Sequence, residues 1–153
     1  INAIMETALG IVENEFHLRH VHLRRELTED MKKALLDENQ IEQVFINILL
    51  NALQAVEDNG LVAVQTAVKP EQKRIHVEIS DNGCGIAPDH LKKIFEPFFS
   101  TKANGTGLGL AVSYGIVENH QGDIRVFSEP GKGTRFIIEF PFLVVDSFDK
   151  GGA

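Results

Sequence analysis

Residues 81–110 of the chain read DNGCGIAPDHLKKIFEPFFSTKANGTGLGL, and they begin with an acidic, glycine-rich loop. Gly83 and Gly85 allow the backbone to adopt positive φ angles and to pass close to a flat ligand. Asp81 supplies a hydrogen-bond acceptor beside that surface. Taken alone, such a loop is also compatible with an ordinary turn at the end of a strand.

The same stretch ends in a second glycine turn, GTGLGL, which leads into an apolar segment. Thr106 is placed to cap a helix that starts around Gly107 and Gly109. The free amides and the positive dipole end of such a helix attract anions. A glycine pair before a helix is also typical of a plain tight turn. The two loops together nevertheless indicate a nucleotide.

Two common phosphate-binding motifs do not explain the second turn. The sequence contains no GxxxxGK[ST] pattern, so this turn is not a P-loop. It is not a Rossmann fingerprint either, because the preceding residues 100–104, STKAN, do not form an apolar strand.

Hydrophobic periodicity on both sides of this stretch predicts a mixture of helices and strands. The expected helices span residues 1–16, 39–57, 89–95 and 107–120, and the expected strands span 21–27, 61–68, 75–80, 123–128 and 134–140. These elements do not follow a strict βαβ order. We therefore expect an α+β fold, a two-layer α/β sandwich whose mixed, mostly antiparallel sheet is covered on one face by three main helices.

The composition is that of one acidic, globular domain. The 153 residues are 43% hydrophobic and 24% charged, with a formal net charge of −7. This charge argues against nucleic acid as a partner, because phosphate backbones need clustered Lys and Arg. No apolar run approaches the roughly 20 residues of a membrane span, so we expect no membrane contact by this chain.

The single cysteine and the first residue bear on the setting of the chain. Cys84 excludes an internal disulfide and fits a reducing environment, so we expect a cytoplasmic location. The chain begins at Ile1 without a signal-like stretch, which we interpret as a piece of a longer protein. Residues 143–153 are expected to form a flexible tail.

The predicted helix over residues 39–57 carries a polar stripe. Most of its surface is apolar, which leaves a strip about 80° wide for uncharged carboxamides. These are Gln40, Gln43, Asn47, Asn51 and Gln54. Buried amides need partners, and two interpretations stay open here. The stripe either faces solvent or ties the helix to neighbouring loops, or it offers oxygen ligands to a hard cation such as Mg²⁺.

Four motifs occur in one order, and their conjunction is specific. They are the Asn47 to Asn51 pair, DNGCGI after a strand, FEPFFSTK followed by GTGLGL, and PGKGT in a hairpin. This order resembles the catalytic ATP-binding domain of bacterial sensor histidine kinases, within the superfamily that includes DNA gyrase, the Hsp90 chaperones and the MutL proteins. The resemblance covers residues 1–142 and implies a Bergerat-type ATP-binding fold.

The resemblance implies ATP and Mg²⁺ as cofactors, with roles for the residues that match the motifs. NILLNA at residues 47–52 is similar to the N box, so Asn51 would bind Mg²⁺ with Asn47 as its helper. Asp81 would accept a hydrogen bond from the adenine amino group. The remaining adenine contacts would be Ala55, Gly83, Gly85, Ile86, Leu110 and Thr134. The expected phosphate contacts are the backbone of Thr106, Gly107, Leu108 and Gly109 and the charge of Lys102.

Position 47 separates the branches of this superfamily. The ATP-hydrolysing relatives carry a glutamate there, whereas Asn47 has no useful basicity, so general-base hydrolysis is disfavoured. A kinase-type site is therefore expected, in which the protein mainly positions and neutralises phosphate. The short segment between Lys102 and Gly107 is similar to that of the nitrogen-regulation class of sensor kinases.

An acceptor histidine of the family pattern is missing from the sequence. The six histidines are followed by Leu, Val, Leu, Val, Leu and Gln, and none by the usual Glu or Asp. The resemblance thus implies two partners, a histidine-containing dimerisation domain of the same parent protein and a response regulator. Alternatives are an anti-sigma-type serine kinase, a gyrase- or Hsp90-type clamp, and a non-catalytic nucleotide-sensing module.

Overall fold

The computed structural model describes residues 1–100 and 107–144. In chain order its elements are α1 (Asn2–Leu18), β1 (His22–Glu26), α2 (Glu38–Ala55), β2 (Leu61–Lys69), β3 (Arg74–Asp81), α3 (Pro88–Leu91), α4 (Gly109–Asn119), β4 (Asp123–Glu129) and β5 (Gly133–Pro141). Within these residues, no helix combines the length and apolar character needed to cross a membrane.

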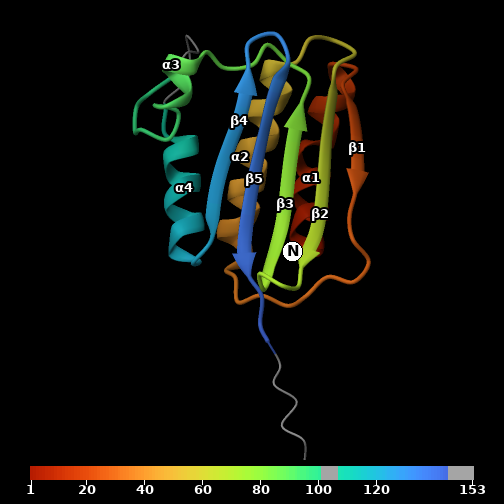
Figure 1. Cartoon of the computed structure of the whole chain (residues 1–153). Coiled ribbons are helices and arrows are strands. Elements are labelled where there is room, and N and C mark those ends of the chain that lie inside the picture. Colours follow the sequence, from red (N-terminus) through yellow and green to blue (C-terminus); the bar gives the residue numbers. More distant parts are fainter. Residues whose placement is uncertain (101–106, 145–153) are drawn as a thin grey trace, which may run out of the picture.

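The five strands form one open sheet in the order β1-β2-β3-β5-β4. β1 runs parallel to β2, and the other three neighbouring pairs are antiparallel. Helices α1, α2 and α4 lie in one layer on the same face of this sheet (Figure 1). The predicted α+β sandwich, with a mixed and mostly antiparallel sheet, is confirmed.

The core fills the space between the sheet and this helix layer. Alternation along β3 turns Ile75, Val77 and Ile79 inward, where they are at most 1% exposed. Phe45 of α2 and Phe140 of β5 are the largest of the fully buried side chains. Each buried side chain of this size contributes about 1.5–3 kcal/mol relative to an exposed one, so α2 is fixed firmly against the sheet.

An arginine at the end of α1 fixes the last turn of α2. Arg19 donates from Nη1 to the Leu53 carbonyl at 2.5 Å and from Nη2 to the Val56 carbonyl at 2.8 Å. Carbonyls in the last turn of a helix lack partners within the helix, and a cation there complements the helix dipole. Val56 is extended, so α2 ends at Ala55 and not at residue 57 as predicted.

Two predicted helices are shorter than expected. α3 ends at Leu91 and is followed by turns, where Pro97 restricts Glu96 and Phe98 adopts a φ of 67°. α4 begins at Gly109, two residues later than predicted, and Leu108 occupies its N-cap position. The apolar Leu108 side chain cannot cap a helix, and the predicted cap residue Thr106 lies outside the described residues.

Four chain segments meet at one end of the sheet. They are the last turn of α2, the loop after β3, the first turn of α4 and the turn between β4 and β5, all at the top in Figure 1. The two glycine loops and the carboxamide stripe, separate in the sequence, therefore come together here.

Candidate functional site

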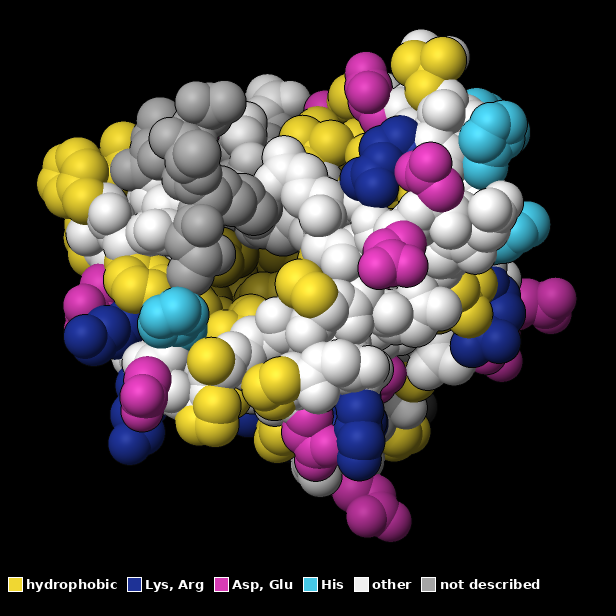
Figure 2. Space-filling model, turned by 90° about the horizontal axis from the view of Figure 1, so that it is seen from above, with side chains coloured by type: hydrophobic (Ala, Val, Ile, Leu, Met, Phe, Trp, Pro, Cys, Tyr) yellow, Lys and Arg dark blue, Asp and Glu magenta, His cyan; other side chains and the backbone are white. Residues whose placement is uncertain are grey.

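A cavity of about 410 Å³ opens at this end of the sheet. Figure 2 looks onto it from above and shows a hollow with hydrophobic side chains inside. Its described lining consists of Asn51, Ala52, Gln54, Ala55, Asp81, Cys84, Gly85, Ile86, His90, Ile94, Phe99, Ser100, Gly107, Gly109, Leu110, Thr134 and Phe136. Both the volume and the mixture of apolar walls with a few polar groups are typical of small-molecule sites.

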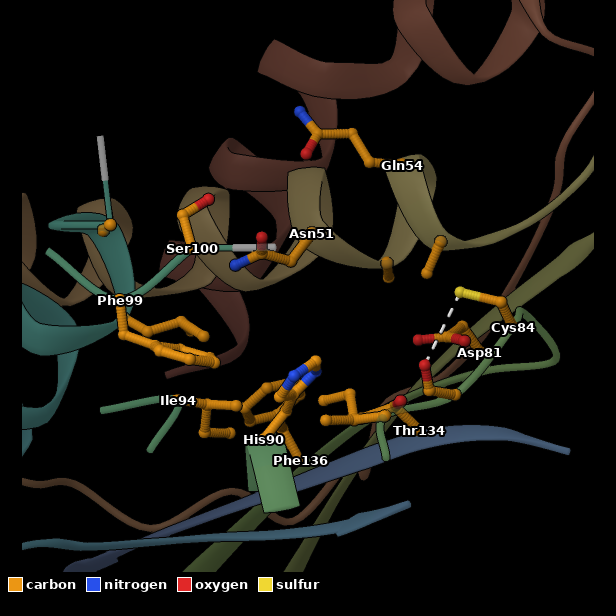
Figure 3. Close-up of a pocket in the computed structure, with 17 residues that line it drawn as sticks. Asn51, Gln54, Asp81, Cys84, His90, Ile94, Phe99, Ser100, Thr134 and Phe136 are labelled. Carbon is orange, nitrogen blue, oxygen red and sulfur yellow. Dashed lines mark hydrogen bonds between the residues drawn. The ribbon is translucent and has the colours of Figure 1, made fainter. Parts of the chain in front are cut away.

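Asp81 lies at one end of the cavity, where β3 ends. It is paired in the sheet register with Thr134 of β5, and the two lie side by side in Figure 3. Its Oδ1 accepts a hydrogen bond from the Gly83 amide at 2.8 Å. Burial raises the pKa of this carboxyl, and backbone hydrogen bonds from Gly83 and Thr134 only partly oppose the rise. Asp81 is thus an acceptor in a poorly solvated position.

The glycines of the first loop bring it against the protein's own backbone, and the positive φ expected of Gly83 is not found. A Cβ atom on Gly83 would lie 2.3 Å from the Ala55 carbonyl oxygen, and Gly83 does not have a positive φ. Gly85 does, at 73°, and a Cβ there would lie 2.0 Å from the Glu129 carbonyl oxygen. The close approach that they permit therefore joins the loop to α2 and to the β4–β5 turn.

A hydroxyl pair closes the same end of the cavity. Ser128 Oγ accepts from the Ile86 amide at 2.8 Å and donates to the Gly133 carbonyl at 2.9 Å. Because its one proton is used in this way, Thr134 Oγ1, 2.8 Å away, is the donor to Ser128 Oγ. The Thr134 hydroxyl is left as an acceptor, in fixed orientation beside Asp81.

The two asparagines of the carboxamide stripe have different surroundings. Asn51 lines the cavity from the upper wall in Figure 3. Asn47, one turn earlier, is not part of the described lining, and its Nδ2 donates to the Gly109 carbonyl and to Ser113 Oγ, both at 3.2 Å. Its Oδ1 accepts from Gln43 Nε2 at 3.1 Å. Asn47 thus ties α2 to α4, and Asn51 lines the cavity, where its role as a ligand of Mg²⁺ stays a prediction.

The three aromatic rings of FEPFF separate in the structure. Phe99 lines the cavity and packs edge-on against His90, with 5.5 Å between ring centroids. Phe95 lies 5.3 Å from Tyr114 and 6.5 Å from Phe136, on the way to the core. Phe98 is 78% exposed.

The cavity brings together most of the residues expected at a nucleotide site. Those in the described lining are Asn51, Ala55, Asp81, Gly85, Ile86, Gly107, Gly109, Leu110 and Thr134. Asn47, Gly83 and Leu108 lie beside the cavity without lining it, and Lys102 and Thr106 lie outside the described residues.

Several lining residues were not anticipated. Gln54 and Ser100 lie in the carboxamide stripe and in FEPFFSTK without a role assigned to them, and His90, Ile94 and Phe136 belong to no motif. The position of Phe136 could be predicted from that of Thr134. The two residues are two positions apart on β5, so they lie on the same face of the sheet, toward the helix layer.

The lining fits a phosphate-bound cation better than a preformed metal centre. Among the described residues, no group of three or more His, Cys, Asp or Glu side chains gathers to hold a metal ion. Mg²⁺ commonly takes one or two protein oxygens and completes its shell with phosphates and water. Asn51, opposite the amide-bearing start of α4, fits such a role.

Comparison with known proteins agrees with this geometry. The family model HATPase_c, described as Histidine kinase-, DNA gyrase B-, and HSP90-like ATPase, matches residues 36–144. The signal transduction histidine-protein kinase AtoS of Escherichia coli strain K12 is 43% identical over 141 residues, which are 92% of this chain and 23% of AtoS. The chain thus spans less than a third of this curated relative.

Two solved structures share the fold. The catalytic domain of histidine kinase ThkA is 28% identical and superposes with a TM-score of 0.82, covering 93% of this chain and 92% of that domain. Full-length ShkA in complex with AMPPNP is 25% identical and gives the same TM-score of 0.82, covering 94% of this chain and 30% of ShkA.

Proposed function

The chain belongs to the HATPase_c family of histidine kinase-, DNA gyrase B- and HSP90-like ATPases, and from this premise we propose that it is the ATP-binding catalytic domain of a two-component sensor histidine kinase. The relatives named as histidine kinases support this branch over the serine-kinase and clamp alternatives. In this proposal the chain binds Mg-ATP and donates the γ-phosphoryl group to a histidine on a separate dimerisation domain.

The observation that carries the proposal is the placement of Asp81. It is a partly buried acceptor at one end of a largely apolar cavity, with the Thr134 hydroxyl and the Ile86 side chain beside it. A flat base with an exocyclic amino group fits this end of the cavity. Its amino group donates a hydrogen bond to Asp81, and its two faces pack against the apolar walls. Ala55 and Leu110 complete the apolar walls of this adenine site.

The opposite side of the cavity provides for phosphate. Gly107 and Gly109 line it at the start of α4, where backbone amides without helical partners favour an anion. Gly107, Leu108 and Gly109, with Thr106 and the charge of Lys102, are the proposed phosphate contacts. Asn51 is the proposed protein ligand of Mg²⁺.

Phosphoryl transfer in such a site depends on positioning. The γ-phosphoryl group passes from the ADP oxygen to a ring nitrogen of the acceptor histidine, which gives up its proton, and ADP leaves. The residues of this chain orient the triphosphate and exclude water, and Asn47 offers no base that would activate water instead. A response regulator is the proposed next acceptor.

We place the domain at residues 1–142. The family model begins at residue 36, but α1 shares the core with α2 and β1 pairs with β2, so both belong to the same folding unit. The exposed thiol of Cys84 supports a reducing, cytoplasmic setting.

Trans-phosphorylation tests the proposal. The chain is mixed with γ-labelled ATP, Mg²⁺ and the helical dimerisation domain of its parent protein. We expect acid-labile, alkali-stable phosphate on a histidine of the added domain. Acid-stable phosphate on serine would favour a serine kinase, rapid basal hydrolysis a clamp, and nucleotide binding without any transfer a sensing module.

A further inference from the structure

Asn47 and Ser113 connect two helices at the phosphate side of the cavity. Asn47 Nδ2 donates to the Gly109 carbonyl and to Ser113 Oγ, and Ser113 Oγ donates to the same carbonyl at 2.8 Å. Ser113 is fully buried. The Gly109 carbonyl is therefore held from two directions, by a side chain of α2 and by a side chain of its own helix.

The contacts of Asn47 do not match those of a metal ligand. A hard cation binds the oxygen of a carboxamide, but Asn47 Oδ1 accepts a hydrogen bond from Gln43 and its Nδ2 faces α4. Asn51, one turn further along the helix, lines the cavity, and Asn47 is not part of the described lining.

Gly109 gives this contact a functional consequence. It is the first residue of α4 and lines the cavity, so its position sets where the first amides of the helix point. The apolar residue Leu108 at the N-cap cannot fix this turn with its side chain. A carboxamide of α2 performs that task from outside the helix.

We propose that Asn47 and Ser113 form a latch that positions the phosphate-binding start of α4, so that Asn47 acts on ATP through Gly109 and not by binding Mg²⁺. The inference rests on the proposed function for its effect on ATP, but the latch itself is a property of the ligand-free chain. Asn47 is in this sense a positioning residue.

Two substitutions separate the latch from a metal ligand. Asn47→Asp keeps an oxygen for Mg²⁺ but removes the donor to Gly109, and Ser113→Ala removes a latch partner that does not line the cavity. Gln40→Ala, on the same polar stripe and nearly two turns from Asn47, is the control. Calorimetry with Mg²⁺-AMPPNP and with adenosine is combined with amide hydrogen exchange of the ligand-free chain.

The latch predicts that both variants bind Mg²⁺-AMPPNP about 5- to 20-fold more weakly, the loss expected for one or two hydrogen bonds, while adenosine affinity is unchanged. The double variant Asn47→Asp/Ser113→Ala loses less than the sum of the two. Exchange accelerates in the first turn of α4 but not in β3, and Gln40→Ala behaves as wild type.

Two results would overturn the latch. One is unchanged exchange at the start of α4 in both variants. The other is a wild-type affinity of Ser113→Ala for Mg²⁺-AMPPNP, because any loss in Asn47→Asp is then an effect of its added charge. If the unaltered chain binds no nucleotide, the proposed function fails and the exchange measurement alone decides the latch.

Discussion

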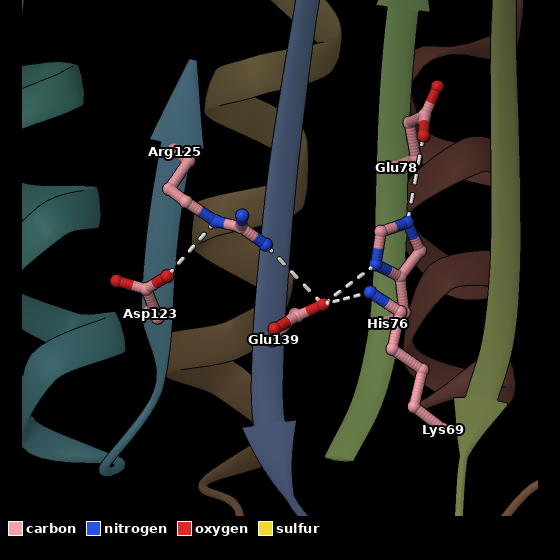
Figure 4. A network of polar contacts seen from close by, with 6 residues as sticks. All are labelled: Lys69, His76, Glu78, Asp123, Arg125 and Glu139. Carbon is pink, nitrogen blue, oxygen red and sulfur yellow. Dashed lines mark hydrogen bonds and ion pairs between the residues drawn. The ribbon is translucent and has the colours of Figure 1, made fainter. Parts of the chain in front are cut away.

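Asp81 and Glu139 lie on neighbouring strands, and they contrast a carboxylate at the cavity with one inside a network of ion pairs. Asp81 ends β3 at the cavity and receives hydrogen bonds from backbone amides. Glu139 lies toward the other end of β5, on the sheet face opposite the helices, and is 8% exposed. Its Oε1 is 2.7 Å from Lys69 Nζ, 3.0 Å from His76 Nδ1 and 3.5 Å from Arg125 (Figure 4).

The two carboxyl groups have opposite pKa shifts. Burial would raise the pKa of Glu139, but hydrogen bonds from His76 and Lys69 and the charges of Lys69 and Arg125 lower it overall. For Asp81, burial prevails and the pKa is raised. The charge of Glu139 is balanced by neighbouring cations, so this carboxylate stabilises the fold. Asp81 is held by backbone amides at the cavity, so its carboxyl can still accept a hydrogen bond from a ligand.

The largest expected effect is on nucleotide affinity. Asp81→Asn replaces a charged acceptor with a neutral amide, so we expect ADP to bind about 30- to 150-fold more weakly, or about 2–3 kcal/mol, as for a lost hydrogen bond to a charged group. Glu139→Gln is the matched control and should bind ADP as the unaltered chain does. Calorimetric affinities that fall equally in both variants would contradict the comparison.

For folding stability, we expect the larger loss from the substitution of Glu139 and not from that of Asp81. Glu139→Gln leaves Lys69 and Arg125 beside a neutral amide, and we expect the free energy of unfolding to fall by about 1–3 kcal/mol, less than for a fully buried pair because both cations are partly exposed. Urea titration measures the change. Asp123→Ala, which removes an exposed partner of Arg125, should cost well under about 1 kcal/mol. A Glu139 variant as stable as that control would show that the network contributes little.

Acid titration distinguishes the two carboxyl groups, because their opposite pKa shifts change the stability of the fold in opposite directions as pH falls. Because the pKa of Glu139 is lower in the folded chain, its stabilisation is complete above the unfolded value of about 4.3 and is lost as pH falls through the folded value. Glu139→Gln should therefore flatten the loss of melting temperature between neutral and strongly acidic pH. An equally steep loss in the variant would assign acid sensitivity to other groups.

The smallest expected effect is a gain in folding stability for Asp81→Asn. The raised pKa of Asp81 means that its ionised form opposes folding once pH exceeds the unfolded value of about 3.9. Asp81→Asn should therefore be slightly more stable than the unaltered chain at neutral pH, by less than about 1 kcal/mol because the carboxyl is partly solvated. Scanning calorimetry at neutral and strongly acidic pH should show the gain only at neutral pH. A variant that melts earlier at neutral pH would indicate that Asp81 also has a structural role.

The sequence was sufficient for the fold and for most of the cavity, because both depend on local patterns. Strand alternation placed Ile75, Val77 and Ile79, and the glycine loops marked Asp81 and Gly109. The Glu139 cluster could not be predicted, since it requires the register of four strands that brings His76 opposite Glu139. The packing role of Gly83 and the contact from Asn47 to α4 likewise depend on how separate segments meet.

Both ends of the described chain lie at the pole opposite the cavity: Ile1 precedes α1 there, and β5 leads there to Leu143 (Figure 1). α2 spans the distance between the poles, about 27 Å for 18 residues. A segment attached at either end would therefore join the domain at the pole opposite the cavity. A rotation of the domain by about 10° about that pole moves a point about 27 Å away by about 5 Å. A small hinge motion at one pole thus becomes a displacement of about 5 Å at the pole that carries the cavity.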